Sequence, residues 1–128
     1  MSQLNRSKAF LMTFTLTLLA VPAMAQSLPQ PDRNGDYMPK EGASHELWMS
    51  VDSDPKGLNC RGNIPPFEGS QQVLATFKKD ETFTAVAPVR GIERIALDNK
   101  GKPWLRVQLK DNKECWVRAN RRFVSPSQ

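Results

Sequence analysis

The fold is decided by the stretch WLRVQLKDNKECWVR, residues 104–118. Its first part, residues 104–109, places apolar side chains at every second position, at Leu105, Val107 and Leu109. That two-residue period is typical of a strand with one buried face. Residues 110–114 are polar and predict a turn, and residues 115–118 predict a second strand. The stretch therefore predicts two short strands joined by a turn.

The same pattern continues on both sides of this stretch. Further short strands are predicted at residues 47–51, 58–61, 73–77, 82–86 and 92–97, with polar turns between most of them, and residues 123–124 close the pattern after a short turn. The loop at residues 62–72 contains two glycines and two prolines, and loops of this length are often functional. Outside the first 25 residues no segment has the helical period. We therefore expect an all-β domain, a small barrel or sandwich of about five to seven short antiparallel strands.

The N-terminus has the three parts of a secretory signal peptide. Residues 1–8 are polar and contain Arg6 and Lys8, residues 9–21 are apolar or threonine, and a small-residue ending closes at Ala25. This order predicts a signal peptide over residues 1–25 with cleavage after Ala25. The alternative is an N-terminal anchor that is never cleaved, although the apolar run is short for a membrane span. We expect export to the periplasm or the medium, with no stable membrane insertion after cleavage.

The segment after the leader has the composition of a linker. Residues 26–46 contain three prolines and two glycines but few large apolar side chains. Such a composition predicts a flexible connection without a packed core, although Tyr37 and Met38 could dock locally. The predicted domain then covers residues 47–128.

Charge is unevenly distributed along the chain. The full sequence has 18 basic and 13 acidic residues, a net charge of +5, and without the leader 16 basic and 13 acidic residues give +3. Residues 26–56 carry 3 basic and 6 acidic residues, net −3, whereas residues 57–128 carry 13 and 7, net +6. Export makes nucleic acid an unsuitable partner. The basic part would suit an anionic wall polymer, and the alternative is an ordinary solvated surface.

Cys60 and Cys115 are the only cysteines. Disulfides persist in the compartments to which a signal peptide leads, so we expect these two residues to pair. In the chain-entropy model a loop of this length stabilises the fold by about 4 kcal/mol. The alternative is two buried free thiols. No metal site is expected, because the chain has no C-x-x-C motif and His45 is its only histidine.

The inventory of reactive side chains does not favour an enzyme. His45 precedes the first predicted strand, so no fold element would position it for a catalytic triad. Asp52 and Asp54 lie in a turn, where solvent keeps both ionised, whereas a glycosidase pair needs one carboxyl in an apolar pocket. We therefore expect no catalysis and no cofactor.

The order of these segments resembles the bacterial Src homology 3 domain family, of the exported, wall-associated type. Residues 58–61 are similar to the first-strand motif of that family, and residues 73–80 to its middle stretch. Residues 102–107 are similar to its tryptophan strand, and residues 115–120 to its last motif. The similarity covers Leu47 to Val124. It implies a small barrel of the Src-homology-3 type.

The chain also departs from the family pattern. Cys60 replaces the valine of the first motif, and Cys115 replaces the glycine of the last motif. A paired replacement of this kind is what a disulfide between the first and the penultimate strand would produce. Asp80 stands where a turn glycine is usual. Arg118 replaces a proline of the last-strand motif, and the chain has a single tyrosine, so a proline-rich ligand is not expected.

The resemblance implies a non-catalytic, monomeric binding module. Its ligand would be peptidoglycan or another cell-wall component, that is, a wall peptide or glycan. The alternative is a protein-partner module, an accessory or inhibitor that docks on an exported enzyme or surface protein. The candidate ligand-binding residues are Arg61, Phe67, Trp104 and Arg118, because tryptophan and arginine contribute most to interface energy. Trp48 and Trp116 are expected to be partly buried barrel residues.

Overall fold

The computed structural model describes residues 11–19, 27–42, 45–64, 71–86 and 94–128. Within these ranges the elements in chain order are α1 (Pro39–Gly42), β1 (Leu47–Ser50), β2 (Leu58–Arg61), β3 (Val73–Phe77), β4 (Thr82–Ala85), β5 (Ile95–Leu97), β6 (Pro103–Gln108), the 3-10 helix η1 (Lys110–Asn112), β7 (Glu114–Arg118) and β8 (Val124–Pro126). The predicted all-β class is confirmed. None of the helices in the described ranges has the length and hydropathy that a membrane crossing requires.

All strands belong to one antiparallel sheet with the order β3-β2-β7-β6-β4-β1-β8. The hairpin predicted from residues 104–118 is its best-paired part, since β6 and β7 are in register from Trp104↔Arg118 to Gln108↔Glu114. The other edge of β6 is shared, because β5 pairs with its first half and β4 with its end. The described residues thus hold eight strands, one more than the upper end of the expected range of five to seven.

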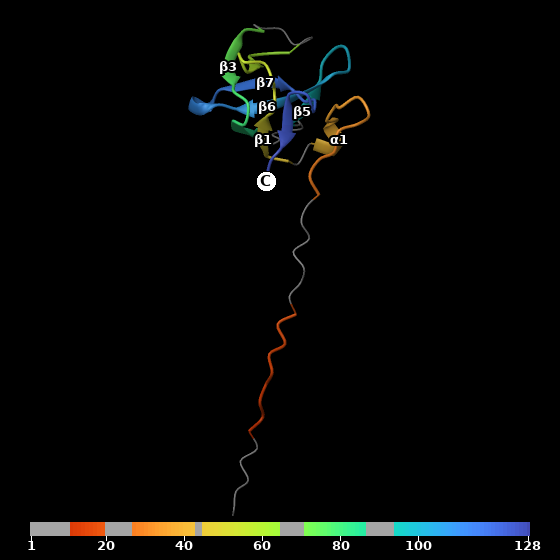
Figure 1. Cartoon of the computed structure of the whole chain (residues 1–128), viewed down its shortest axis with the longest axis vertical. Helices are drawn as coiled ribbons and strands as arrows, with labels where there is room; N and C mark the ends of the chain where they lie inside the picture. The colour runs from red at the N-terminus through yellow and green to blue at the C-terminus, as the bar shows by residue number, and fades with distance from the viewer. Residues whose placement is uncertain (1–10, 20–26, 43–44, 65–70, 87–93) are drawn as a thin grey trace, which may run out of the picture.

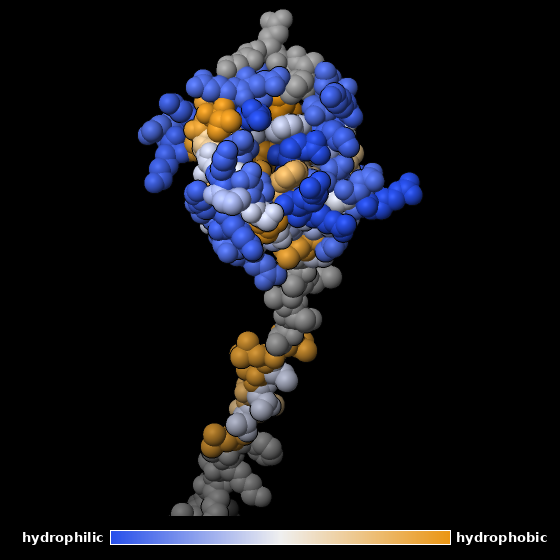
Figure 2. All heavy atoms as spheres, turned by 45° about the horizontal axis from the view of Figure 1, so that its top comes forward, coloured by the Kyte–Doolittle hydropathy of each residue, from blue (hydrophilic) through white to orange (hydrophobic). Residues whose placement is uncertain are grey.

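The sheet is not closed into the barrel that the sequence suggested. Its strand path starts at β3 and ends at β8, and no pairing among the described residues joins these two ends. Figure 1 shows the strands gathered into one rounded body, from which residues 11–19 extend away. The surface in Figure 2 is largely hydrophilic, with small separate apolar patches on this body.

The core follows from the two-residue alternation of the strands. Leu105 and Val107 of β6 and Val117 of β7 are fully buried, whereas the residues between them are half-exposed. Trp48 of β1 is also fully buried, more deeply than expected, and its Nε1 donates a hydrogen bond to the carbonyl oxygen of His45 at 3.0 Å. Burial with a satisfied indole N–H explains a tryptophan at this depth.

The predicted disulfide is present. Cys60 in β2 and Cys115 in β7 are bonded, with a Cα–Cα distance of 5.3 Å and 55 positions between them in sequence. Because β2 and β7 are neighbours in the sheet, the bond crosslinks adjacent strands from the two ends of the domain sequence.

The segment expected to be a flexible linker differs from that prediction over residues 32–38, which we call the strap. Tyr37 is only 4% exposed and packs edge-on against Trp48, with ring centroids 5.0 Å apart. Backbone hydrogen bonds fix the strap, from Tyr37 N to Ala119 O at 2.8 Å and from Arg121 N to Gly35 O at 2.7 Å. Packing of one aromatic side chain and a few backbone bonds are enough to order a segment of linker composition.

A glycine makes this docking possible. Gly35 has a φ of +84°, a conformation that side chains with a Cβ rarely adopt. A Cβ at this position would lie 2.9 Å from Cγ of Arg121, so with another residue there the Arg121 side chain would have to move.

Candidate functional site

Three of the four predicted ligand-binding residues line one surface pocket. Arg61, Trp104 and Arg118 lie around a hollow of about 220 Å³, which we call the Trp104 pocket. Phe67, the fourth, lies outside the described residues. The remaining lining residues are Asp52, Asp54, Gly57, Leu58, Asn59 and Phe123.

Strand register brings these side chains together. Arg118 in β7 is directly opposite Trp104 in β6, and Arg61 in β2 is directly opposite Trp116 in β7. Side chains of directly opposed residues lie on the same face of a sheet. Residues far apart in sequence therefore become neighbours on one face.

That face is the outer one. In β2, β6 and β7 the core-facing positions alternate with exposed or half-exposed positions. The outward positions of these three strands include Asn59, Arg61, Trp104, Arg106, Trp116 and Arg118. Trp116 is thus half-buried on the outer face, beside the pocket, and its partial burial agrees with the expectation.

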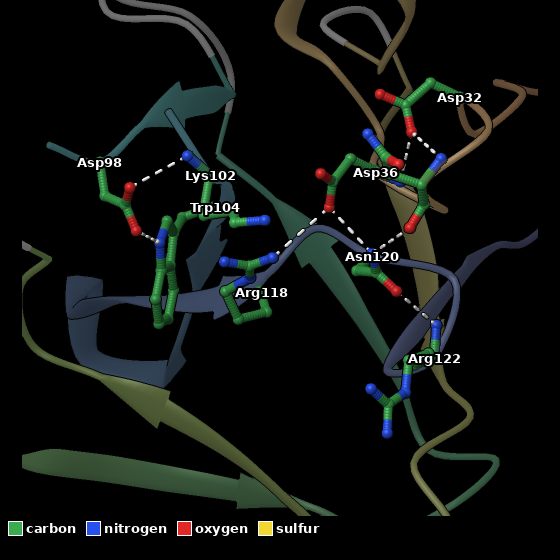
Figure 3. Close-up of polar contacts among 9 residues, drawn as sticks. Asp32, Asp36, Asp98, Lys102, Trp104, Arg118, Asn120 and Arg122 are labelled. Carbon is green, nitrogen blue, oxygen red and sulfur yellow. Dashed lines mark hydrogen bonds and ion pairs between the residues drawn. The ribbon is translucent and has the colours of Figure 1, made fainter. Parts of the chain in front are cut away.

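Trp104 is held in place from both sides. Its Nε1 donates a hydrogen bond to Asp98 Oδ2 at 2.9 Å, and the guanidinium carbon of Arg118 lies 5.5 Å from the centre of its ring (Figure 3). An arginine over an indole face is a favourable cation–π contact. Because the indole N–H is already bonded, Trp104 offers a ligand its apolar ring surface.

The carboxylate that holds Trp104 belongs to a tight turn. Asp98 Oδ1 accepts hydrogen bonds from the backbone N–H groups of Lys100 at 2.8 Å and Lys102 at 3.0 Å. Burial alone would raise the pKa of Asp98. The hydrogen bonds from Trp104 and from the two backbone amides, together with the positive charge of Arg118, outweigh burial and lower this pKa below its ordinary value.

Arg118 has a second partner in the strap. Its Nη2 lies 3.4 Å from Asp36 Oδ1, and the same oxygen accepts a hydrogen bond from Nδ2 of Asn120 at 2.8 Å. Asp36 is almost buried, with 9% of its side chain exposed, whereas the Arg118 side chain is 24% exposed. Arg118 Nε is buried and has no hydrogen-bond partner among the described residues.

The pocket contains charges of both signs. Asp52 and Asp54 each use one carboxylate oxygen in the β1–β2 turn. Asp52 Oδ1 accepts a hydrogen bond from the backbone N–H of Asp54 at 3.0 Å, and Asp54 Oδ1 accepts one from the backbone N–H of Lys56 at 2.9 Å. Arg61 donates to the carbonyl oxygen of Gln71 at 3.2 Å. The pocket therefore combines hydrogen-bond acceptors, guanidinium donors and an aromatic surface. These are the groups that bind a polar ligand in a surface pocket.

His45, the one histidine, does not line the pocket. Its Nε2 lies 2.8 Å from the carbonyl oxygen of Ser127, and its ring packs edge-on against Trp48. It thus ties the C-terminal end to the beginning of the domain. Among the described residues, no group of acidic, histidine and cysteine side chains could hold a metal ion.

Several residues of the site were not identified from the sequence. Asp98 could have been suspected, because a turn carboxylate six residues before a tryptophan can reach its indole N–H. Asp36 carries no local signal, since it lies 82 positions before Arg118. Phe123 was noted only as one of the two closing residues of the pattern, and Asp52 and Asp54 were considered only as turn residues and as a catalytic pair.

No protein-family model, curated protein or solved structure matches this chain.

Proposed function

We propose that this protein is an exported, non-catalytic binding module, that the Trp104 pocket is its ligand site, and that the ligand is peptidoglycan or another cell-wall component. The observation that carries the proposal is the meeting of Arg61, Trp104 and Arg118 in one pocket. Aromatic and arginine side chains are the types that dominate binding energy at protein surfaces.

The charges of the pocket support this class of ligand. Wall peptides carry both carboxylate and amino groups, and the pocket offers guanidinium groups to the first and aspartates to the second. The net charge of +6 over residues 57–128 would also attract anionic polymers at long range. Neither interaction needs a cofactor.

Three further observations agree with an exported module. The first 25 residues have the order of a signal peptide. The disulfide is of a kind that persists outside the cytoplasm. The order of segments resembles the wall-associated Src homology 3 domains, and the domain is all-β. We propose that it acts as a monomer.

Cosedimentation with purified wall sacculi tests the proposal. The exported protein should pellet with the sacculi, and the bound fraction should fall as salt is raised, because salt screens the charged contacts. Trp104→Ala should weaken retention by about tenfold, as expected for a central aromatic contact. Leu97→Ala, at an exposed apolar position outside the pocket, is the matched control and should bind normally. Complete recovery of the wild-type protein in the supernatant would refute wall binding.

The second candidate is a protein-partner module that docks on an exported enzyme or surface protein. The outer face of β2, β6 and β7 favours it, because Trp104, Trp116 and three arginines give this face the composition of a protein interface. A pull-down from periplasmic extract would then yield one protein in stoichiometric amount. Trp104→Ala should abolish that capture, and an unchanged yield would remove the pocket from the interface.

A further inference from the structure

We infer that the strap supports the binding site from outside the pocket and that Asp36 is the residue that positions Arg118 beside Trp104. This inference rests on the proposed function of the Trp104 pocket. It gives a role in binding to a segment that its composition alone would assign to a linker.

The strap has a fixed position relative to the site. Asp36 and Asn120 form a β-bridge, and Nδ2 of Asn120 also donates to the carbonyl oxygen of Asn34 at 3.2 Å. Asn120 is itself buried and comes two residues after Arg118. The same short stretch of chain therefore carries both the anchor of the strap and the arginine of the pocket.

The carboxylate of Asp36 is oriented before it meets Arg118. Asp32 Oδ1 accepts a hydrogen bond from the backbone N–H of Asp36 at 2.9 Å, which shapes the strap turn (Figure 3). Asn120 Nδ2 then fixes Asp36 Oδ1 at 2.8 Å, and this oxygen faces Nη2 of Arg118. A carboxylate held in this way offers a fixed point of attachment to a long side chain.

Arg118 needs such an attachment. Arginine loses much rotamer freedom when it is ordered, and the buried Nε of Arg118 has no partner among the described residues. Among the residues that the structure describes, Asp36 carries the only carboxylate in ion-pair contact with Arg118. The pair with Asp36 on one side and the ring of Trp104 on the other fix the guanidinium in one place. A site that is ordered before binding does not lose this freedom when the ligand arrives.

Asp36→Asn tests the inference in the cosedimentation assay at a fixed salt concentration. The amide keeps the shape of Asp36 but removes its charge, so Arg118 should become mobile and binding to sacculi should weaken by about 3- to 10-fold. Glu81→Gln is the matched control, because it removes the same charge at an exposed position outside the pocket. It should bind like the wild type. Unchanged or tighter binding by Asp36→Asn would overturn the inference.

A double-mutant comparison separates positioning from a general loss of structure. In an Arg118→Ala background, Asp36→Asn should weaken binding no further, because the side chain that it positions is gone. An equal loss in both backgrounds would show that Asp36 only supports the fold and would overturn the inference.

A readout without ligand distinguishes this inference from the proposed function. In NMR spectra of the free protein, Asp36→Asn should shift the Arg118 Nε–Hε and Trp104 indole signals, whereas Glu81→Gln should leave both in place. If the wild type does not bind sacculi, the proposed function fails and these signals still decide the positioning role. Unchanged signals in Asp36→Asn would overturn it.

Discussion

Tyr37 shows how one side chain can join a segment to a domain. It is the only tyrosine of the chain, it comes from the strap, and its ring lies in the core against Trp48. Burial raises the pKa of its hydroxyl, and the positive charge of Arg121 opposes this only in part. The folded state therefore favours the neutral phenol.

The raised pKa of Tyr37 predicts a loss of stability at alkaline pH. A group with a raised folded-state pKa contributes stability that is complete below its unfolded pKa, here about 10, and is lost as pH rises through the folded value. Absorbance titration reports this group alone, because no other tyrosine exists. The pH at which half of the tyrosine is ionised should be higher in the folded protein than in urea. In the Tyr37→Phe variant, folding stability should fall less as the pH rises into the alkaline range. Equal midpoints in the two states would contradict this prediction.

The lowered pKa of Asp98 predicts the opposite behaviour in acid. Its contribution to stability is present above the unfolded pKa and is lost as pH falls through the lower folded value. Trp104→Phe removes the indole donor but keeps an aromatic ring, so the pKa of Asp98 should rise. The carboxyl carbon signal of Asp98 in an NMR titration measures this, with Trp116→Phe as the control. A pKa of Asp98 that does not move would mean that the backbone amides and the charge of Arg118 lower it without the indole.

The candidate site was predictable only where residue type was informative. Arg61, Trp104 and Arg118 were selected as residue types that bind, and the sheet brings them together. Asp36 was not predictable, because its role depends on a contact across 82 positions that no local pattern encodes. Phe67 remains a prediction.

At three positions in the turns, the backbone adopts a conformation that the residue type disfavours. Asp80, between β3 and β4, has a φ of 72°, and Asp111 and Asn112 in η1 have φ values of 66° and 58°. These are left-handed conformations, which cost least for glycine and are tolerated by aspartate and asparagine. The resemblance described in the sequence analysis had led us to expect a glycine at the position of Asp80.

Asp80→Gly should therefore raise the stability of the domain slightly. Relief of the left-handed strain is worth about 1 kcal/mol, and the greater freedom of glycine in the unfolded chain offsets part of it, so the net gain is about 0.5 kcal/mol. Urea denaturation should show a higher midpoint. The reciprocal change, Gly101→Asp, has the same conformational setting and open space for a side chain, so it should lower the midpoint. A lower midpoint for Asp80→Gly would contradict the prediction.

Strand positions were predicted well because alternation is a local property. The segments predicted at 104–109 and 115–118 correspond to β6 and β7 with ends that differ by one residue. The polar turn between them contains η1, which its composition did not indicate. Of the segment predicted at 92–97, residues 95–97 form β5, and residues 92 and 93 lie outside the described residues.

At the scale of the whole molecule, the weakest connection in the sheet is the one that carries the disulfide. β2 and β7 share one residue pair in register, Arg61↔Trp116, whereas β6 and β7 share five. Without the bond, few backbone contacts would hold β2 and its neighbour β3 to the rest of the sheet. The bond between Cys60 and Cys115 reinforces this junction.

Cys60→Ser should consequently destabilise the whole domain. The chain-entropy model gives a loss of about 4 kcal/mol for a loop of this length, which is a large part of the stability of a small domain. Thermal unfolding should occur at a lower temperature, and the wild type in a reducing agent should behave like the variant. Hydrogen exchange should accelerate first in β2 and β3. An unchanged melting temperature under non-reducing conditions would contradict the prediction.

The all-β class and the disulfide could be predicted for the whole molecule, but the open strand path could not. Closure depends on whether β3 and β8, which are far apart in sequence, meet across the body. Local alternation places a residue on a face of a strand but does not say which strand lies beside it. For the same reason the sequence allowed a local docking of Tyr37 and Met38 but did not indicate which part of the domain the strap contacts.

Under the proposed export, the bond between β2 and β7 also has a consequence for the time at which the domain becomes stable. Thiols stay reduced in the cytoplasm, so a newly made copy would lack this crosslink and would have a smaller free energy of unfolding. A translocase that threads extended polypeptide would then meet little resistance. After export, oxidation would join Cys60 and Cys115 covalently and stabilise the folded domain. The folded, crosslinked domain could then not pass back through the translocase.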